Sequence, residues 1–278
     1  MIEFIAIFIA LAGTLIASYY DLKTTEIPDL LPIIMMVSGI SINLLSFMIN
    51  GNAESLFLAI INGIIFSAVG FSMYLGGQWG AGDAFLLTAI GFLIPKNFFT
   101  NNEFPFFFTY LVNLFFLGSL YMIIYSIVYS LREKKAIRYF KGQIMRFSRA
   151  ILLLFVLFLI ASSILSYLIL NSVNIKLVII SSVSSIALIV FWIFSKSVEK
   201  SFIKRIPVSE LKVGDVLLES KRWDGISEEE LRKIKRSGKK YVYIRTGVCF
   251  APAFPIALVY TFLFGNSVVN FIKLLYLI

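Results

Sequence analysis

Long apolar runs constrain this sequence more than any other feature. Several of them approach 20 residues, the length that a helix needs to cross a bilayer. Only 15% of the 278 residues are charged, whereas soluble domains carry about 25%. Because the bilayer core offers the backbone no water, spanning segments must be helices. The sequence predicts an all-α polytopic membrane protein, with candidate spans at residues 2–20, 30–49, 54–76, 84–99, 105–131, 150–170, 175–195 and 249–272.

Two of these spans are irregular. Pro95 interrupts the fourth, whose clean apolar part, 84–94, is too short to cross a bilayer alone. The eighth has Pro252 and Pro255 near its start. We therefore expect about six to eight transmembrane helices.

The basic residues sort to one side of this arrangement. Eight spans place 22 of the 25 Lys and Arg residues on one face, which identifies that face as cytoplasmic. The N-terminus is then outside, and the net charge of +9 is mainly a topology signal. The basic loop is short, next to the membrane, and lacks a nucleic-acid-binding module. We expect it to attract anionic lipid, and we expect no nucleic-acid partner.

Residues 202–246 form a polar insert between apolar runs. "FIKRIPV", "VGDVLLES" and "KYVYIRT" have the pattern of short strands. "SEEELRKIKRSG" is typical of a capped helix, with Ser227 and Glu230 as a capping box and Gly238 after its end. The insert is predicted to be a small β-β-α-β cytoplasmic module with no visible catalytic residues.

The residue types that are missing limit the chemistry. The chain has no histidine, which removes His-based acid–base catalysis and His-ligated metals. Cys249 is the single cysteine, so a zinc cluster of cysteines is excluded. Any hydrolysis must use carboxylates, hydroxyls or lysine, and we expect no cofactor and no metal.

Two aspartates stand out on the predicted topology. Asp21 ends the first span in "IASYYDLKTTEIPDLL", and Asp83 opens the fourth in "LGGQWGAGDAFLLTAIG". Both lie at one depth, near the cytoplasmic face, on separate helices. Taken singly, Asp21 is explained as a solvated acid beside the membrane, and Asp83 as an acid favoured by a helix N-terminus. Taken together they are candidates for a functional site, because ionisable groups at membrane depth are costly.

Two such carboxylates support one kind of reaction. Aspartates that share a site do not both ionise cheaply, so one keeps a proton. The ionised group can activate a water, and the protonated group can polarise or protonate a scissile amide. Gly80 and Gly82 would permit unusual backbone angles and the close approach of a substrate backbone, or would simply form a flexible turn. The pattern leaves open which aspartate is the base.

At these residues the sequence resembles a known family. "GAGD", residues 80–83, matches the GxGD signature of membrane aspartyl proteases. "DLKTTEIPDLL" is similar to the first-aspartate motif of type IV prepilin peptidases, with Asp29 where Asn is usual. The later "RIPVSELKVGDVL", "DGISEEELRKIK" and "GVCFAPAFPIALVY" are similar to archaeal members, which include the prepilin and preflagellin peptidases.

The resemblance implies a function and its residues. These enzymes remove the short basic leader from pilin or archaellin precursors at the cytoplasmic membrane face. It implies that Asp21 and Asp83 are the catalytic pair, with Gly80 and Gly82 supporting them. From their charge, Glu26 and Asp29 would either attract the leader's basic residues or be solvated loop acids. Bacterial members typically carry a tetracysteine zinc motif and a second, methyltransferase activity. Because this chain has one cysteine, we expect it to have neither. Members of the family often have about six spans.

We expect five segments. They are a catalytic transmembrane core with both aspartates at 1–131, a basic cytoplasmic loop at 132–149, additional transmembrane helices at 150–198, a cytoplasmic α+β domain at 199–247 and a C-terminal transmembrane helix at 248–278.

Three alternatives stay open. A presenilin or signal-peptide-peptidase type protease shares GxGD, but places its aspartates on consecutive helices, whereas two spans intervene here. A proton-coupled transporter could use the same aspartates as ion ligands, although no internal repeat is evident. The third alternative is a non-enzymatic assembly protein of a filament machinery.

Overall fold

The computed structural model of the protein describes residues 2–51, 53–96, 104–221 and 223–276. The chain divides into two compact units, one of residues 1–123 and 205–278 and the other of residues 124–204. Six of the described helices are long and apolar enough to cross a membrane. The prediction of a multi-pass, mainly α-helical membrane protein with a small α+β insert is confirmed.

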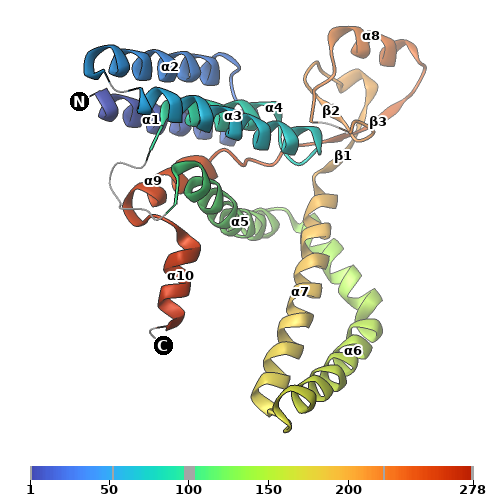
Figure 1. The fold of residues 1–278 in the computed structure, drawn as a ribbon. Coiled ribbons are helices and arrows are strands. Elements are labelled where there is room, and N and C mark those ends of the chain that lie inside the picture. The colour runs from blue at the N-terminus through green and yellow to red at the C-terminus, as the bar shows by residue number, and fades with distance from the viewer. Residues whose placement is uncertain (1, 52, 97–103, 222, 277–278) are drawn as a thin grey trace. The chain divides into compact units, whose positions relative to one another are not determined.

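The first unit contains a group of apolar helices from the N-terminal part of the chain. Four of them lie side by side in Figure 1. They are α1 (Ile2–Thr24), α2 (Leu30–Asn50), α3 (Glu54–Leu75) and α4 (Ala81–Leu93). The helix that follows, α5 (Phe106–Arg132), begins in this unit.

Helix α4 is the short fourth span, and its C-terminal end is capped from outside. At about 1.5 Å per residue its 13 residues do not cross a hydrocarbon core about 30 Å thick. The buried Asn43 amide donates to the Phe92 carbonyl at 3.0 Å. The buried Asn62 amide donates to the carbonyls of Ile94 and Pro95, both at 2.9 Å. These bonds satisfy carbonyls that a helix end would leave unpaired. The last residues of the predicted span, 97–99, lie outside the described part of the chain.

The predicted C-terminal span is wrong as a single helix. Residues 249–272 contain α9 (Ala253–Phe264), and α10 (Ser267–Tyr276) follows a break at Gly265 and Asn266. Gly265 has a φ of +74°, a conformation that ends a helix. Asn113 of α5 holds the break, because its amide donates to the Gly265 carbonyl at 2.7 Å and its oxygen accepts the Ser267 N–H at 2.8 Å.

The insert folds as a small sheet and one helix, as predicted. Its sheet has the order β1-β3-β2. The elements are β1 (Ile203–Pro207), whose residues from Arg205 onward belong to this unit, the 3₁₀ turn η1 (Val208–Glu210), β2 (Val216–Leu217), α8 (Glu228–Arg236) and β3 (Tyr241–Arg245). Strand β2 pairs antiparallel with β3, with Val216 opposite Arg245.

The predicted capping box of α8 is present. The Glu230 carboxylate accepts the Ser227 N–H at 2.8 Å, and the Ser227 hydroxyl accepts the Glu230 N–H at 3.3 Å. The hydrogen bond from the Ser227 N–H lowers the pKa of Glu230 below its usual value. Gly238 beyond the helix has a φ of +71°. We call this insert the polar module.

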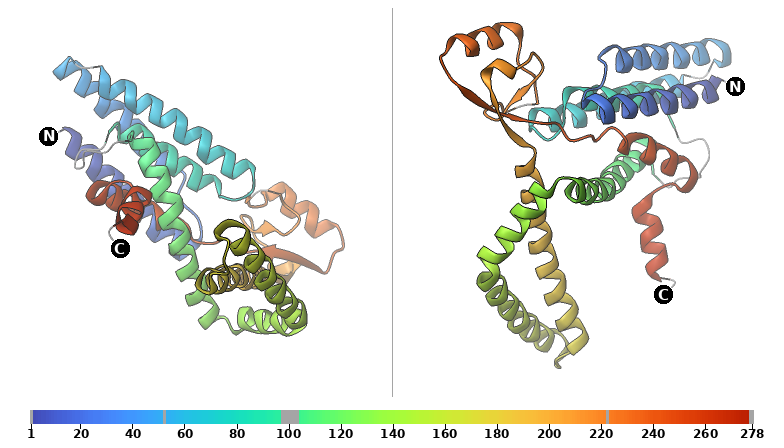
Figure 2. Two further views of the ribbon diagram at one scale, coloured as in Figure 1. Left: turned by 60° about the horizontal axis from the view of Figure 1, so that its bottom comes forward. Right: turned by 180° about the vertical axis from the view of Figure 1, so that it is seen from behind.

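The second unit is a helical hairpin. It contains α6 (Lys134–Leu170), α7 (Ile175–Ser201) and the C-terminal part of α5. Figures 1 and 2 show α6 and α7 side by side. Residues 134–149, predicted as a loop, are the N-terminal part of α6, because nothing in this basic segment interrupts a helix.

Candidate functional site

Asp21 lies in the last turn of α1. The helix ends after Thr24, where Thr25 takes a φ of +60° and its N–H returns to the Asp21 carbonyl at 2.8 Å. The Asp21 side chain is buried, with 5% of the residue exposed. This helix end fixes where the carboxylate lies.

A segment more than 220 residues away holds Asp21. The Ala251 N–H, just before α9, donates to Asp21 Oδ2 at 2.8 Å. The buried Cys249 thiol donates to the Asp21 main-chain carbonyl at 3.2 Å. The sequence prediction missed this contact between the Cys249–Ala251 segment and Asp21. The one signal in the sequence that could have pointed to it is the resemblance of "GVCFAPAFPIALVY" to archaeal members.

Asp83 lies in the first turn of α4. Its Oδ2 accepts the N–H of Gly80, the residue that precedes the helix, at 3.2 Å. This bond satisfies a backbone donor at the helix start, as an acid at the third helical position commonly does. The explanation of Asp83 as a helix-terminus acid therefore holds for its local geometry, and it does not exclude a further role.

The two aspartate motifs pack against each other. A Cβ atom added to Gly82 would lie 2.9 Å from Cβ of Ile27, so only glycine fits beside the Ile-Pro pair. Gly80 has an ordinary extended conformation, and an added Cβ there would meet only Asp83 Oδ2, at 3.6 Å. The expectation of unusual backbone angles at these glycines is wrong, because neither has a positive φ. Gly82 gives Ile27 room, and Gly80 leaves open space.

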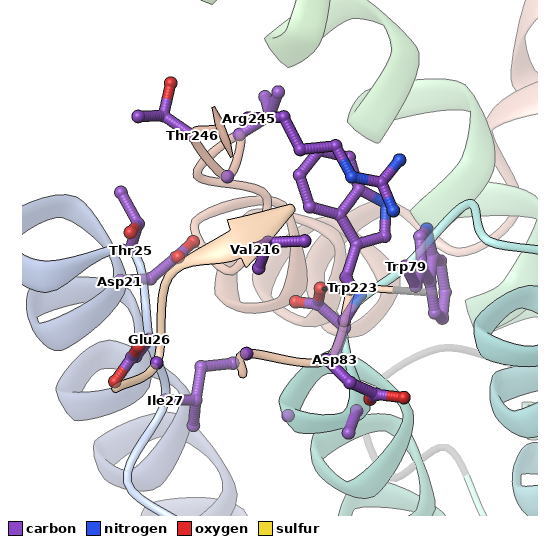
Figure 3. Close-up of a pocket in the computed structure, with 18 of the residues that line it drawn as sticks. Asp21, Thr25, Glu26, Ile27, Trp79, Asp83, Val216, Trp223, Arg245 and Thr246 are labelled. Atoms are coloured by element: carbon purple, nitrogen blue, oxygen red, sulfur yellow. Dashed lines mark hydrogen bonds between the residues drawn. The ribbon is translucent and has the colours of Figure 1, made fainter. Parts of the chain in front are cut away.

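A cavity of about 1070 Å³ lies beside these motifs, and the first unit supplies all of its lining. Figure 3 shows both aspartates among the side chains that line it. The structure brings together all six residues singled out in the sequence, namely Asp21, Glu26, Asp29, Gly80, Gly82 and Asp83. Their roles remain predictions.

The polar module forms another wall of this cavity, which the sequence did not predict. The Trp223 indole N–H donates to the Gly77 carbonyl at 3.0 Å, and the Tyr74 hydroxyl donates to Asp224 at 2.7 Å. The Arg245 guanidinium lies over the Trp223 ring (Figure 3), with Cζ 4.1 Å from the ring centroid. Gly77 has a φ of +67°, and an added Cβ would lie 2.6 Å from the carbonyl oxygen of Lys221. The module therefore docks on the turn that leads into "GAGD".

The cavity lining is acidic, although the chain is basic. The lining contains six carboxylates but only two cations, Lys212 and Arg245. The carboxylates belong to Asp21, Glu26, Asp29, Asp83, Asp215 and Asp224. A cavity of this charge suits a cationic ligand. Within the described residues, no group of three or more potential ligands from His, Cys, Asp and Glu could hold a metal ion.

A family model matches the part of the chain that carries both aspartates. Residues 8–127 match the profile of the type IV leader peptidase family. Through these residues the chain is similar to that family. A preflagellin peptidase from Methanocaldococcus jannaschii is 38% identical over 96 residues, which are 34% of this chain and 39% of that protein. The chain thus matches about two fifths of its relative's length. The polar module and the Cys249–Ala251 segment lie outside the residues matched to the leader peptidase family.

Proposed function

We propose that the protein is a membrane-embedded aspartyl endopeptidase that removes the short basic leader from type IV pilin-like or archaellin precursors. One observation carries the proposal: Asp21 and Asp83, from separate helices, line one acidic cavity inside the region that matches the leader peptidase family. The similarity to a preflagellin peptidase supports the substrate class.

The proposed chemistry needs only the two carboxylates and a water. The ionised aspartate takes a proton from the water, whose oxygen attacks the carbonyl carbon of the scissile amide. The protonated aspartate donates to the carbonyl oxygen, which stabilises the tetrahedral intermediate. The C–N bond then breaks, the leaving nitrogen takes the proton that the first aspartate removed from the water, and the products are a carboxylic acid and an amine. Each aspartate has one oxygen, Oδ2, in a bond to a backbone N–H, which holds the carboxyl group in place for the water and the substrate.

The surroundings of the aspartates suit a basic leader. Glu26 and Asp29 come from the turn after α1, and Asp215 and Asp224 come from the polar module. A leader that carries Lys or Arg would be attracted to this lining, and the precursor's hydrophobic helix would remain in the bilayer.

The test is a cleavage assay on purified protein in lipid. The substrates are a type IV pilin-like precursor, an archaellin precursor and an unrelated single-span peptide, and mass spectrometry maps each product. We expect one cut, just before the hydrophobic segment, in a precursor only. Cleavage of the unrelated peptide within its span would favour a presenilin-like protease instead. Failure to cut any precursor while the protein carries protons across vesicles would favour a transporter.

A matched pair of substrates tests the role of charge. Replacing the leader's Lys and Arg with Gln should raise KM because the acidic lining then loses its partner. The same number of Lys→Gln changes beyond the hydrophobic segment is the control and should leave KM unchanged. Equal effects of the two changes would contradict charge recognition in the cavity.

A further inference from the structure

The helical hairpin contains a second cavity, separate from the aspartates. It has a volume of about 520 Å³, and its lining belongs to the second unit alone. Helix α6 contributes Tyr139, Gln143, Arg146 and Phe147, which share one face of the helix because of their spacing. The remaining lining comes from α7 and the residues after it, namely Trp192, Ile193, Lys196, Ser197, Glu199, Lys200 and Ile203.

The charged groups of this cavity leave an excess of positive charge. Lys196 forms a salt bridge of 2.7 Å with Glu199, three residues further along α7. Lys200 lies over the Tyr139 ring at 5.1 Å, and Arg146 lies over the Phe147 ring at 5.6 Å. Within the described part of the chain, neither Arg146 nor Lys200 forms an ion pair. Two cations in one cavity with no anionic partner favour an anionic occupant.

The cavity lies where the hairpin changes from basic to apolar. Residues 134–149 of α6 carry six Lys and Arg residues, and from residue 150 onward the helix is apolar. Beyond the cavity, the hairpin exposes large apolar side chains, including Leu152, Leu157 and Leu188. Trp and Tyr are enriched at this level of membrane proteins, where a ring has an apolar and a wet side. Trp192 and Tyr139 fit that description.

We propose that this cavity binds the phosphate headgroup of an anionic phospholipid. Arg146 and Lys200 would bind the phosphate, and the acyl chains would follow the exposed apolar side chains of α6 and α7. The volume falls in the range of small-molecule sites, about 300–1000 Å³. An inorganic phosphate would satisfy the cations but would leave the adjoining apolar surface without a partner. The inference does not depend on the proposed peptidase activity.

The experiment compares two double variants of the full-length protein. Arg146→Gln with Lys200→Gln removes both unpaired cations of the cavity. The control variant, Arg138→Gln with Lys141→Gln, removes two exposed cations of α6 that do not line the cavity. Both variants lose the same charge, so general attraction to an anionic membrane changes equally. Arg146 and Lys200 are exposed, so their replacement buries no unpaired group.

Binding is measured by native mass spectrometry and by fluorescence titration of protein in neutral detergent. The probes are phosphatidylglycerol, phosphatidylcholine and inorganic phosphate. We expect the cavity variant to bind phosphatidylglycerol at least about tenfold more weakly than wild type, because two charge-assisted bonds are lost. The control variant should stay within about twofold of wild type, and phosphatidylcholine should bind weakly to all three proteins.

Two results would overturn the proposal. Equal weakening in both variants would mean that binding follows overall charge and not this cavity. Displacement of phosphatidylglycerol by an equal concentration of inorganic phosphate would mean that the cavity binds a soluble anion and that the lipid chains add nothing.

Discussion

Helix α4 and the part of α6 from residue 150 onward are both apolar, but the two helices have opposite surroundings. Of the 13 residues of α4, eight are buried, whereas only Ala136 and Ser166 are buried among the 37 residues of α6. Helix α4 packs against α1, α2 and α3, whereas α6 packs mainly along α7 within its unit. Hydrophobicity therefore does not distinguish a helix that shapes a site from one that faces lipid; packing partners do.

Close backbone contact explains how α4 is enclosed. An added Cβ at Gly39 of α2 would lie 2.7 Å from the Phe92 backbone of α4. An added Cβ at Gly91 of α4 would lie 2.7 Å from the Asn62 carbonyl oxygen of α3. At Gly70 the nearest backbone atoms, those of Ala84, would be 3.0 Å away. Small residues let membrane helices approach closely, since lipid offers no hydrophobic drive for their association. The contacts place the first turn of α4, and so Asp83, with little freedom.

A leucine pair gives the largest expected difference in stability between the two regions. Leu87 of α4 is fully buried, and Leu157 of α6 is 51% exposed. Leu87→Ala should lower the free energy of unfolding by about 2–5 kcal/mol, because a cavity remains. Leu157→Ala should change it by less than about 0.5 kcal/mol. Unfolding in mixed micelles measures both, and similar losses at the two sites would contradict the comparison.

A glycine pair tests the backbone contacts themselves. Gly91→Ala should lower the free energy of unfolding by about 1–3 kcal/mol, because the new Cβ meets the Asn62 carbonyl oxygen. Gly142→Ala is the control in α6, where nothing lies within 4 Å, and it should stabilise the helix by up to about 1 kcal/mol. Opposite signs support the comparison, and destabilisation by both changes would argue against it.

Metal removal should have no effect on either region. The proposed chemistry uses two carboxylates, so EDTA and zinc-specific chelators should leave leader cleavage unchanged. Initial rates before and after dialysis against chelator measure this. Loss of cleavage with chelator, followed by recovery when zinc is added, would show that the aspartates do not act alone.

Local patterns predicted much of the fold. The apolar runs predicted the long helices, and alternation with a capping box predicted the strands and α8 of the polar module. The basic charges of residues 134–149 suggested a loop, but charge does not end a helix where no proline or capping signal intervenes. The break at Gly265 depends on Asn113, 152 residues away, and no local pattern reveals it.

The site was predictable to the same extent. Spacing and motif placed Asp21 and Asp83 at one depth, and the structure places both on one cavity. The Ala251 N–H and the wall formed by Trp223 and Asp224 were not predicted, because they depend on contacts between segments more than 100 residues apart. The Ala251 contact uses a backbone N–H, which nearly every residue has, so the identity of the residue does not reveal it.

The most direct test of the central claim measures single-turnover leader cleavage by Asp21→Asn, Asp83→Asn and the double variant, each shown to insert and fold as wild type. The claim is that the two aspartates act as one catalytic unit. Each single variant should lose at least about 10²–10⁴-fold in rate, and the double variant should be no slower than the singles, because residues that act as a unit are not additive. Full activity in either single variant, or losses that multiply in the double variant, would contradict the claim.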